Sequence, residues 1–409
     1  MRQTNQSTKE QPMPASPQDP IVIVGAARTP MGSLQGDFAD LAAHDLGGVA
    51  IRAALARAGL APETVGEVLM GNCLMAGQGQ APARQAAFKG GLPDSAGAVT
   101  LSKMCGSGMK AAMLAHDMLL AGTHEVIVAG GMESMSRAPY LLQKGRAGYR
   151  LGHDRLYDHL MLDGLEDAYE AGRSMGTFGE DCAARYQFSR AQQDAFASAS
   201  VQRAQAATAS GAFAAEIEPV AVKTRAGQTL VSIDEGPGKI RLEKIATLKP
   251  AFKKDGTITA ASSSSINDGA AALVLLRASS AQKLGCQPLA RIVSHATHAQ
   301  APQWFATAPL GAAQKALAKA GWAVGDVQLW EINEAFAVVP MALMKELNLA
   351  HEQVNVNGGA CALGHPIGAS GARIVVTLIH ALKARGLRRG LATLCIGGGE
   401  ATALALESM

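Results

Sequence analysis

The sequence predicts an α/β protein made of two similar halves, with a long segment inserted into the first half. Short apolar runs that end near glycine alternate with Ala- and Leu-rich stretches of helical length, which is typical of a parallel or mixed sheet covered by helices. A chain of 409 residues is also too long for one ordinary domain. Residues 128–133 (VAGGME) resemble residues 395–400 (CIGGGE), which indicates an internal duplication.

The expected elements follow the same order in both halves. Short apolar runs predict buried strands at residues 21–25, 68–71 and 125–131 in the first half, and at 290–293, 327–331 and 392–396 in the second. Apolar residues at helical spacing predict helices at residues 40–59, 106–121, 189–210 and 370–384.

The alternation of strands and helices breaks over residues 136–265, which we interpret as the inserted segment. Long insertions often cover or build a binding site. Residues 266–288 then supply the last strand and helix of the first half. The predicted division is a flexible tail at 1–19, a first half at 20–135 and 266–288, the insertion at 136–265, and a second half at 289–409. The tail is rich in Gln, Ser, Thr and Pro and lacks the apolar core of a secretory signal.

Composition excludes several classes of function. Hydrophobic residues make up 48% of the chain and charged residues 17%, as expected of a well-buried globular protein. The net charge of +3 comes without a long Lys/Arg run, so we expect no nucleic-acid partner. No uninterrupted apolar run reaches membrane-spanning length, so we expect no membrane partner. Six cysteines without a CxxC pair predict neither a metal site nor a disulfide framework, and suggest a reducing compartment, the cytoplasm.

Cys105 lies in a glycine-rich frame, SKMCGSG at residues 102–108, just before a predicted helix. Backbone N–H groups at a helix start should lower its thiol pKa from ~8.5 and favour the nucleophilic thiolate. The alternative is a buried structural cysteine.

His365 and Cys395 occupy two further glycine-rich frames. His365 stands between Gly364 and Pro366 at a predicted helix start, where it could exchange a proton with a thiol, or it could serve in capping or packing. Cys395 is followed by three glycines whose N–H groups could hold an oxyanion; the alternative is a turn with a buried cysteine. These glycines do not have the spacing of a dinucleotide fingerprint.

Two polar segments complete the candidate residues. The amide of Asn333, after a predicted strand, could anchor a water or cap a helix. Four serines at residues 262–265 could form a flexible turn or bind an amide-bearing ligand.

Together these segments resemble the motifs of the thiolase family over nearly the whole chain past residue 20, and most of all its biosynthetic-type members. The resembling segments are 27–30 (ARTP), 82–85 (PARQ), 102–108, 333–336 (NEAF), 357–368 (NGGACALGHPIG) and 395–399 (CIGGG). The resemblance implies a thiolase-like fold: two duplicated α/β halves with mixed sheets stacked in layers, and an inserted loop domain that binds coenzyme A.

The resemblance also implies a reaction, the reversible Claisen condensation of two acetyl-CoA to acetoacetyl-CoA and coenzyme A through an acyl-cysteine. Coenzyme A thioesters are then substrates, neither a cofactor nor a metal is expected, and a homotetramer or homodimer is suggested. Three alternatives remain: a 3-ketoacyl-CoA thiolase for longer chains, a non-catalytic thiolase-like lipid carrier, and a cysteine–histidine hydrolase. Two reactive thiols with a histidine disfavour the carrier, and Cys395 would be unexplained in a hydrolase.

Residue roles carry over from the family motifs. Cys105 resembles the nucleophile, His365 its activator, Asn333 the holder of an oxyanion-hole water, and Cys395 the acid/base, while the N–H groups of Cys105 and Gly397 resemble a second oxyanion hole. The expected substrate contacts are Ser264, beside the pantetheine arm, together with Leu165, Met175, Phe252 and Phe336.

The sequence departs from the family pattern around the substrate. Ala261 and Ser262 replace Gly and Asn, Ser174 stands where short-chain members often carry His, and Phe305 stands where many carry Met. Glu400 and Ala401 replace Met or Gln followed by Gly. These changes leave the catalytic groups intact and bear on the acyl-chain preference.

Overall fold

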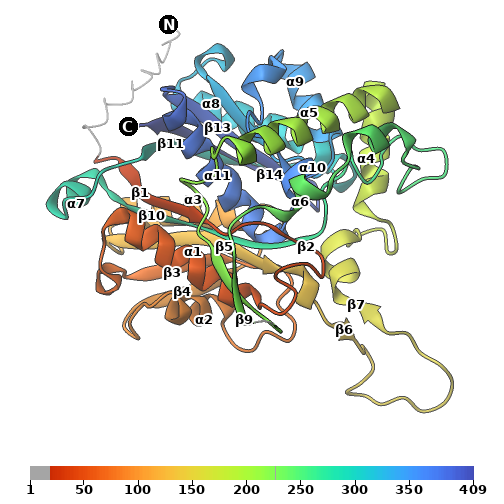
Figure 1. Cartoon of the computed structure of the whole chain (residues 1–409), viewed down its shortest axis with the longest axis horizontal. Coiled ribbons are helices and arrows are strands. Elements are labelled where there is room, and N and C mark those ends of the chain that lie inside the picture. The colour runs from red at the N-terminus through yellow and green to blue at the C-terminus, as the bar shows by residue number, and fades with distance from the viewer. Residues whose placement is uncertain (1–18, 226) are drawn as a thin grey trace, which may run out of the picture.

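The computed structural model describes residues 19–225 and 227–409, so the predicted tail lies almost wholly outside the described residues. Its main feature is a ten-stranded mixed sheet with the strand order β12-β13-β14-β11-β1-β10-β5-β3-β4, with β2 (Gly32–Ser33) pairing with β10 (Figure 1). The first half comprises β1 (Ile21–Arg28), α1 (Ala43–Ala58), β3 (Glu67–Gly71), α2 (Pro82–Lys89), β4 (Gly97–Leu101), α3 (Ser107–Ala121), β5 (Val126–Ser134), β10 (Asn267–Arg277) and α7 (Ala278–Lys283). The second half comprises β11 (Ala290–Ala299), α8 (Ala308–Ala320), β12 (Leu329–Ile332), α9 (Val338–Leu347), α10 (Ala360–Leu363), α11 (Ile367–Ala384), β13 (Arg389–Ile396) and β14 (Glu400–Ser408).

The two halves repeat the same strand pairing, which confirms the duplication. In the first half β3 runs parallel to β5, β5 antiparallel to β10, and β10 antiparallel to β1. In the second half β12 runs parallel to β13, β13 antiparallel to β14, and β14 antiparallel to β11. The place of β4 is taken there by a single parallel bridge between Trp330 and Val354.

The expected layers are present, and their sheets are continuous with each other. A short antiparallel contact joins β1 to β11, where Val22 faces Arg291 and Ile23 faces Ala290. Apolar side chains of α3 and α11 form one core together with strands from both halves. Helices α1 and α2 cover the outer face of the first half, and α8 and α9 cover that of the second. The central helices α3 and α11 are therefore enclosed between the two parts of the sheet.

Glycines allow α3 and α11 to meet closely at their N-terminal ends. A Cβ on Gly108 would lie 2.7 Å from the Ala372 nitrogen, and one on Gly371 would lie 2.4 Å from the Met109 nitrogen. Any side chain at either position would push the helices apart. This contact brings the residues just before both helices to one place.

Helix α11 is long and apolar enough, by length and composition alone, to cross a membrane, with a mean hydropathy of 1.3 over 18 residues. Of this stretch 83% is buried inside the structure, between the two parts of the sheet. Its composition is accounted for by its place in the core.

The inserted segment contains mainly helices and two small hairpins. Its elements are β6 (Tyr140–Leu141), β7 (Tyr157–Asp158), α4 (Met175–Tyr186), α5 (Arg190–Ala209), β8 (Val220–Thr224), β9 (Gly227–Val231) and α6 (Glu235–Lys239). Arg28, fully buried at the end of β1, holds this segment through Glu216 (2.5 Å) and Asp234 (2.7 and 2.8 Å). A buried charge requires such partners, so Arg28 fixes the insertion to the first half.

Candidate active site

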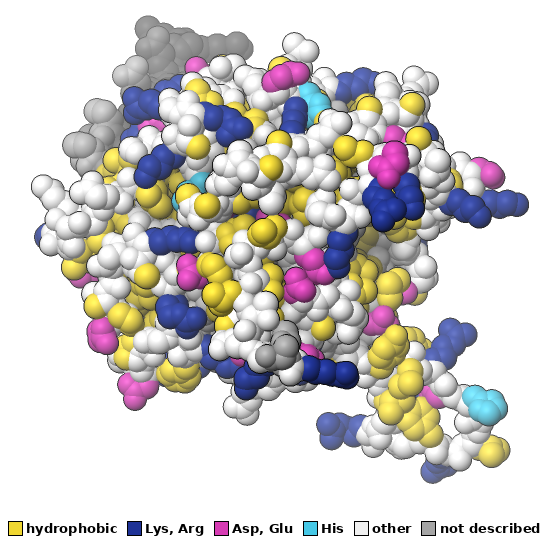
Figure 2. Space-filling view, viewed as in Figure 1, with side chains coloured by type: hydrophobic (Ala, Val, Ile, Leu, Met, Phe, Trp, Pro, Cys, Tyr) yellow, Lys and Arg dark blue, Asp and Glu magenta, His cyan; other side chains and the backbone are white. Residues whose placement is uncertain are grey.

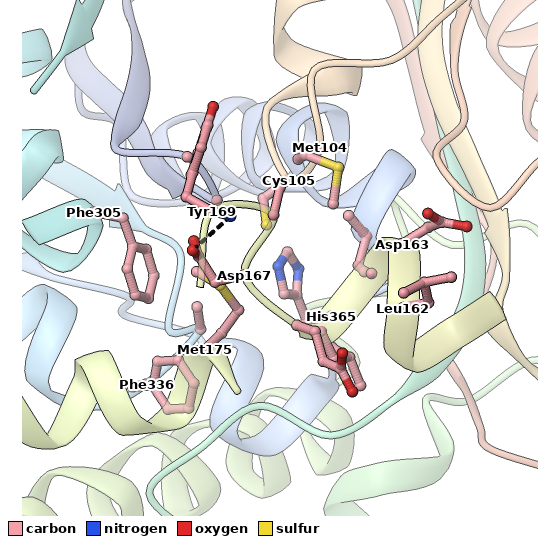
Figure 3. A pocket seen from close by; sticks show the side chains of 18 residues that line it. Met104, Cys105, Leu162, Asp163, Asp167, Tyr169, Met175, Phe305, Phe336 and His365 are labelled. Carbon is pink, nitrogen blue, oxygen red and sulfur yellow. Dashed lines mark hydrogen bonds between the residues drawn. The ribbon is translucent and has the colours of Figure 1, made fainter. Parts of the chain in front are cut away.

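A cavity of about 310 Å³ opens beside the N-terminal ends of α3 and α11. Gly106 alone separates Cys105 from α3, Pro366 alone separates His365 from α11, and both side chains line the cavity with Gly397. Figure 3 shows the Cys105 sulfur and the His365 ring next to each other at its centre. Because α3 and α11 belong to different halves, the duplication places one candidate group from each half in the same cavity.

A tight turn between β4 and α3 presents Cys105. Met104 has a φ of 47°, a left-handed conformation that is uncommon for a residue other than glycine. The Gly106 N–H donates to the Lys103 carbonyl at 3.1 Å and closes the turn. A Cβ on Gly106 would lie 2.3 Å from the Ile396 side chain, so glycine is needed for the turn to approach the end of β13.

The resting Cys105 is a protonated thiol, contrary to the expectation from the sequence. Burial raises the pKa of Cys105 to about 11, although the backbone N–H groups of Gly397 and Cys105 itself act to lower that pKa. The expected N–H groups are therefore present, but removal of the sulfur from water outweighs them. The cysteine needs a proton acceptor at the moment of attack.

His365 is held in the tautomer that can accept this proton. The Ser370 hydroxyl donates to the Pro366 carbonyl at 2.9 Å, so the His365 Nδ1–H must donate to the Ser370 oxygen at 2.6 Å. His365 Nε2 is buried and has no hydrogen-bond partner among the described residues. Burial lowers the pKa of His365 to about 3, followed by the charge of Arg373, so the ring is neutral with a free lone pair on Nε2.

Cys395 lies just behind the cavity, at the end of β13. Its side chain is fully buried and does not line the cavity. Burial raises the pKa of the Cys395 thiol, and the charge of Cys105 raises it further, as expected of two neighbouring thiols. The turn after it requires glycine, because Gly398 and Gly399 have φ values of 90° and 85°.

Asn333 lies directly after β12 and does not line the cavity. Its side chain is 1% exposed, and neither its amide nitrogen nor its amide oxygen has a partner among the described residues. Buried amides are normally hydrogen-bonded, so this side chain is suited to hold a water or a ligand group.

The predicted substrate contacts divide into two groups. Leu165, Met175 and Phe336 line the cavity. Phe252 does not line it and packs edge-on against Phe336, with ring centroids 5.6 Å apart. Ser264 also lies outside the lining, and its N–H donates to the Ala335 carbonyl at 2.9 Å, next to Phe336.

Three features of the site were not predicted. Around the predicted Leu165, the inserted segment contributes a continuous stretch to the lining, residues 162–169, whose acidic side chains Asp163, Glu166 and Asp167 were not expected. Ser370 orients His365, and its place in the first turn of a helix after that histidine is a signal the sequence offered. Glu133 ends the repeated VAGGME motif, yet the motif does not reveal that this glutamate is buried.

Glu133 ties together the loops around the cavity. Its carboxylate accepts the backbone N–H groups of Cys73 (3.0 Å), Leu74 (3.1 Å) and Gly368 (2.8 Å), and the side-chain amide of Asn72 (2.5 Å). Burial nonetheless raises the pKa of Glu133 to about 7.

The fold and the site together define an acyltransferase of the thiolase class. Residues 21–279 match the N-terminal domain of thiolase, and residues 286–408 match its C-terminal domain. The chain therefore belongs to the thiolase family.

Individual members of the family show which thiolases this chain is similar to. The chain is 49% identical to an acetyl-CoA acetyltransferase of Chromobacterium violaceum over 389 residues, covering 95% of this chain and 99% of that protein. It is 50% identical to acetyl-CoA acetyltransferase 2 of Arabidopsis thaliana, with 96% and 98% covered. The crystal structure of the Bacillus anthracis acetyl-CoA acetyltransferase superimposes with a TM-score of 0.92 at 42% identity, covering 95% of this chain and 99% of that one. A thiolase of Ascaris suum, solved in complex with coenzyme A, superimposes with a TM-score of 0.90 at 41% identity, with 95% and 100% covered.

Proposed function

We propose that this chain is an acetyl-CoA C-acetyltransferase, which condenses two acetyl-CoA to acetoacetyl-CoA and coenzyme A and runs the reverse thiolysis. One observation carries the proposal: a cysteine thiol and an imidazole with a free, buried nitrogen share a cavity, and a second thiol lies directly behind it. The names of the relatives at about half identity agree with this reaction.

The first half-reaction transfers an acetyl group to Cys105. His365 Nε2 takes the thiol proton as the sulfur attacks the thioester carbonyl. A water held by Asn333 stabilises the oxyanion, and the carbon–sulfur bond to coenzyme A breaks. The departing thiolate takes the proton of Cys395, which leaves a Cys395 thiolate beside a protonated His365. Burial disfavours both charged forms, so only their mutual attraction holds them until the second substrate restores the neutral groups.

The second half-reaction forms the carbon–carbon bond. The Cys395 thiolate removes an α-proton from a second acetyl-CoA, and the resulting enolate attacks the acetyl-Cys105 carbonyl. The N–H groups of Cys105 and Gly397 stabilise the charge on oxygen, a type of donor whose loss commonly slows a reaction by ~10²–10³. The Cys105 sulfur leaves and takes back its proton from His365, so every group returns to its starting state.

The aromatic wall of the cavity favours short acyl groups. Phe336 contacts Phe305 at a centroid distance of 6.3 Å and Phe252 at 5.6 Å, and Met175 lies beside them in the lining. Phe305 takes the place where many thiolases carry the more flexible Met. A longer-chain 3-ketoacyl-CoA thiolase is therefore the less favoured reading.

Two measurements test this function together. After incubation with acetyl-CoA, mass spectrometry should find an acetyl group on the Cys105 peptide, and acetoacetyl-CoA should form. Thiolysis measured against the chain length of the 3-ketoacyl-CoA should be fastest for the four-carbon substrate. An unmodified Cys105 in the active enzyme would refute the mechanism, and faster cleavage of long chains would favour the alternative substrate class.

We further propose that the inserted segment receives the coenzyme A portion of the substrate. It supplies residues 162–169 and Met175 to the cavity, and Ser264 at its end lies one backbone hydrogen bond from the residue before Phe336. The thioesters act as substrates, and the proposed chemistry uses neither a cofactor nor a catalytic metal. All six cysteines, which lie within the described residues, are free thiols, in keeping with a reducing compartment such as the cytoplasm.

A homotetramer or homodimer fits two exposed features of the surface. Strand β4 is an edge strand with Val99 47% exposed, and unpaired edge strands readily pair with another chain. The segment between β6 and β7 projects from the body, and Figure 2 shows hydrophobic side chains gathered on this projection at the lower right. Leu151 and Leu156 on it are 102% and 62% exposed.

Light scattering on the purified protein tests the assembly. Val99→Lys should reduce a dimer to monomers, and Leu151→Ser with Leu156→Ser should reduce a tetramer to dimers. A monomeric wild-type protein would contradict the proposal.

A further inference from the structure

Two histidines and an aspartate meet on the surface where α3 of the first half lies beside β11 of the second half. Asp117 Oδ1 lies 3.0 Å from His116 Nδ1 and 2.9 Å from His295 Nε2, and the two nitrogens are 3.3 Å apart. His116 and Asp117 belong to α3, whereas His295 belongs to β11. None of the three lines the cavity that holds Cys105 and His365.

Protons alone do not satisfy this triangle of atoms. The Asp117 oxygen only accepts, so each nitrogen must carry a proton to bond with it, and two N–H groups then face each other across 3.3 Å. If one nitrogen loses its proton, its lone pair faces the carboxylate instead. A cation at the centre removes the conflict, because all three atoms can then donate electron pairs to it.

The distances and burial suit a divalent transition-metal ion. Ligand atoms of a tetrahedral zinc site, with bonds of ~2.0–2.2 Å, lie roughly 3.3 Å apart, close to the separations here. The side chains of His116 and His295 are 14% and 13% exposed, and Asp117 is 53% exposed, which leaves room for water as a further ligand.

Some charged groups around the three ligand atoms favour a bound cation, and one disfavours it. Burial lowers the pKa of His295, while Asp117 acts to raise it, so the imidazole is available as a neutral ligand near pH 7. Burial acts to raise the pKa of Asp117, but His116 and His295 together lower that pKa below its usual value, so the carboxylate is ionised. The Lys319 ammonium group donates a hydrogen bond to the His295 carbonyl at 3.0 Å, and its positive charge disfavours a cation nearby. Two imidazoles and one carboxylate still match the donor set that zinc commonly takes.

We propose that His116, Asp117 and His295 bind one zinc-class divalent ion, which joins the two halves of the chain at the surface, apart from the active site. The absence of a CxxC pair and the family resemblance predict no metal, and neither bears on a site whose two histidines come from distant segments of the chain. The bound ion links α3 to β11 through its ligands, and it takes no part in acyl transfer.

Calorimetric titration of the metal-free full chain with zinc chloride at pH 7.5 tests the site. One ion should bind per chain. Asp117→Asn and His295→Gln should each weaken binding by at least ~10-fold, since even outer-shell changes commonly have effects of this size. The active-site thiols compete poorly, because burial raises the pKa values of Cys105 and Cys395 and a metal requires the thiolate.

His124→Gln is the matched control. His124 Nε2 lies 3.6 Å from a carboxylate oxygen of Glu67. This pair offers a metal ion one imidazole and one carboxylate but no second imidazole. Zinc binding should be unchanged in this variant. Equal zinc affinity in wild-type and Asp117→Asn protein, or no binding to the wild type at micromolar zinc, would overturn the proposal.

Thermal unfolding provides an independent readout. Zinc should raise the Tm of the wild-type protein, because a ligand that binds only the folded state stabilises it, and at the same zinc concentration it should raise the Tm of Asp117→Asn clearly less. Asp117 is exposed on a helix, so this variant should fold and keep its acyltransferase activity. An equal rise in Tm for both proteins would place the bound zinc elsewhere and refute the site.

Discussion

The turns before α3 and α11 occupy corresponding positions in the two halves, yet they present different chemical groups to the cavity. The first turn presents Cys105 as a buried, protonated thiol beside backbone N–H groups. The second presents His365 with Nδ1 committed to Ser370 and Nε2 free. Duplication of one half placed two helix starts at a shared cavity, and each start could then take a different role.

The connections that follow β5 and β13 differ even more. After β5 the chain leaves for the whole inserted segment, which lines the cavity through residues 162–169. After β13 it turns at once through Gly397, Gly398 and Gly399 into β14. The long connection builds the substrate side of the site, whereas the short one leaves a thiol and an N–H group close to Cys105.

The glutamates that end the repeated motifs connect the two halves crosswise. Glu133, from the first half, accepts the N–H of Gly368 at the start of α11. Glu400, from the second half, pairs with Lys103 in the turn before Cys105. Each half therefore stabilises, through one hydrogen bond or ion pair, the turn that carries the candidate catalytic residue of the other half.

Among the variants that test these differences between the halves, removal of the Cys105 sulfur should have the largest effect on activity. In Cys105→Ala we expect loss of both acetylation and condensation, on the order of 10⁴–10⁶ in kcat, as for other covalent nucleophiles. Mass spectrometry and acetoacetyl-CoA formation measure the two steps. Cys286→Ala, a buried cysteine in a separate core, is the control and should retain activity.

Cys395→Ala should separate the two half-reactions. Without the base the condensation should fall by ~10²–10⁴, a usual range for general acid–base groups. Transfer of an acetyl group to Cys105 should persist in a single turnover, because the protonated His365 can give its proton to the departing thiolate in place of Cys395. An equal loss of both steps would contradict the assignment of separate roles to the two thiols.

Ser370→Ala tests whether the tautomer of His365 matters. Loss of the hydroxyl frees Nδ1 and allows the proton to move to Nε2, so kcat/KM should fall by ~10–100-fold, as for other groups that orient a histidine. The pH profile of kcat/KM should also shift. A uniform decrease at every pH would mean that Ser370 only packs against the ring.

Glu133→Gln should have the smallest effect, on the pH dependence of stability. Because the folded-state pKa of Glu133 is raised from 4.5 to about 7, its protonated form is favoured in the folded state. Its stabilising contribution is complete below pH 4.5 and is lost as the pH rises toward 7. A shift of this size corresponds to ~3 kcal/mol in the free energy of unfolding.

Tm measured across this pH range in both proteins reports the effect as a difference in slope. The wild-type Tm should decrease with rising pH more steeply than that of Glu133→Gln. Glu331 and Asp268, whose pKa values burial raises to about 8 and about 6, contribute to both proteins and cancel in the comparison. Parallel slopes would mean that Glu133 does not titrate in this range.

Local patterns were enough to predict much of the fold and part of the site. The strands could be predicted because their residues are nearly all buried, which produces continuous apolar runs, as in β5 and β13. Cys105, His365 and Gly397 could be singled out because their glycine-rich turns are visible in the sequence. The family resemblance supplied their pairing, which no local pattern contains.

The remaining features depend on contacts between distant segments. The direction of the Cys105 pKa shift depends on its burial, and a helix start alone does not reveal that burial. Residues 162–169 have neither strand nor helix periodicity, so only the family resemblance, through Leu165, indicated that this stretch lies in the cavity. The junction of β1 and β11 consists of two residue pairs, Val22 with Arg291 and Ile23 with Ala290, too few to predict.

The enclosed position of α11 has a consequence for synthesis of the chain. The side chains of Ile374, Val375 and Leu378 complete a core that the first half begins with Met109 and Ile127. On the ribosome, the inner face of the first half stays uncovered until residues 367–384 have been synthesised, well after the first half itself. A nascent chain that stalls earlier exposes a broad apolar face, so this protein should depend on chaperones until α11 has emerged.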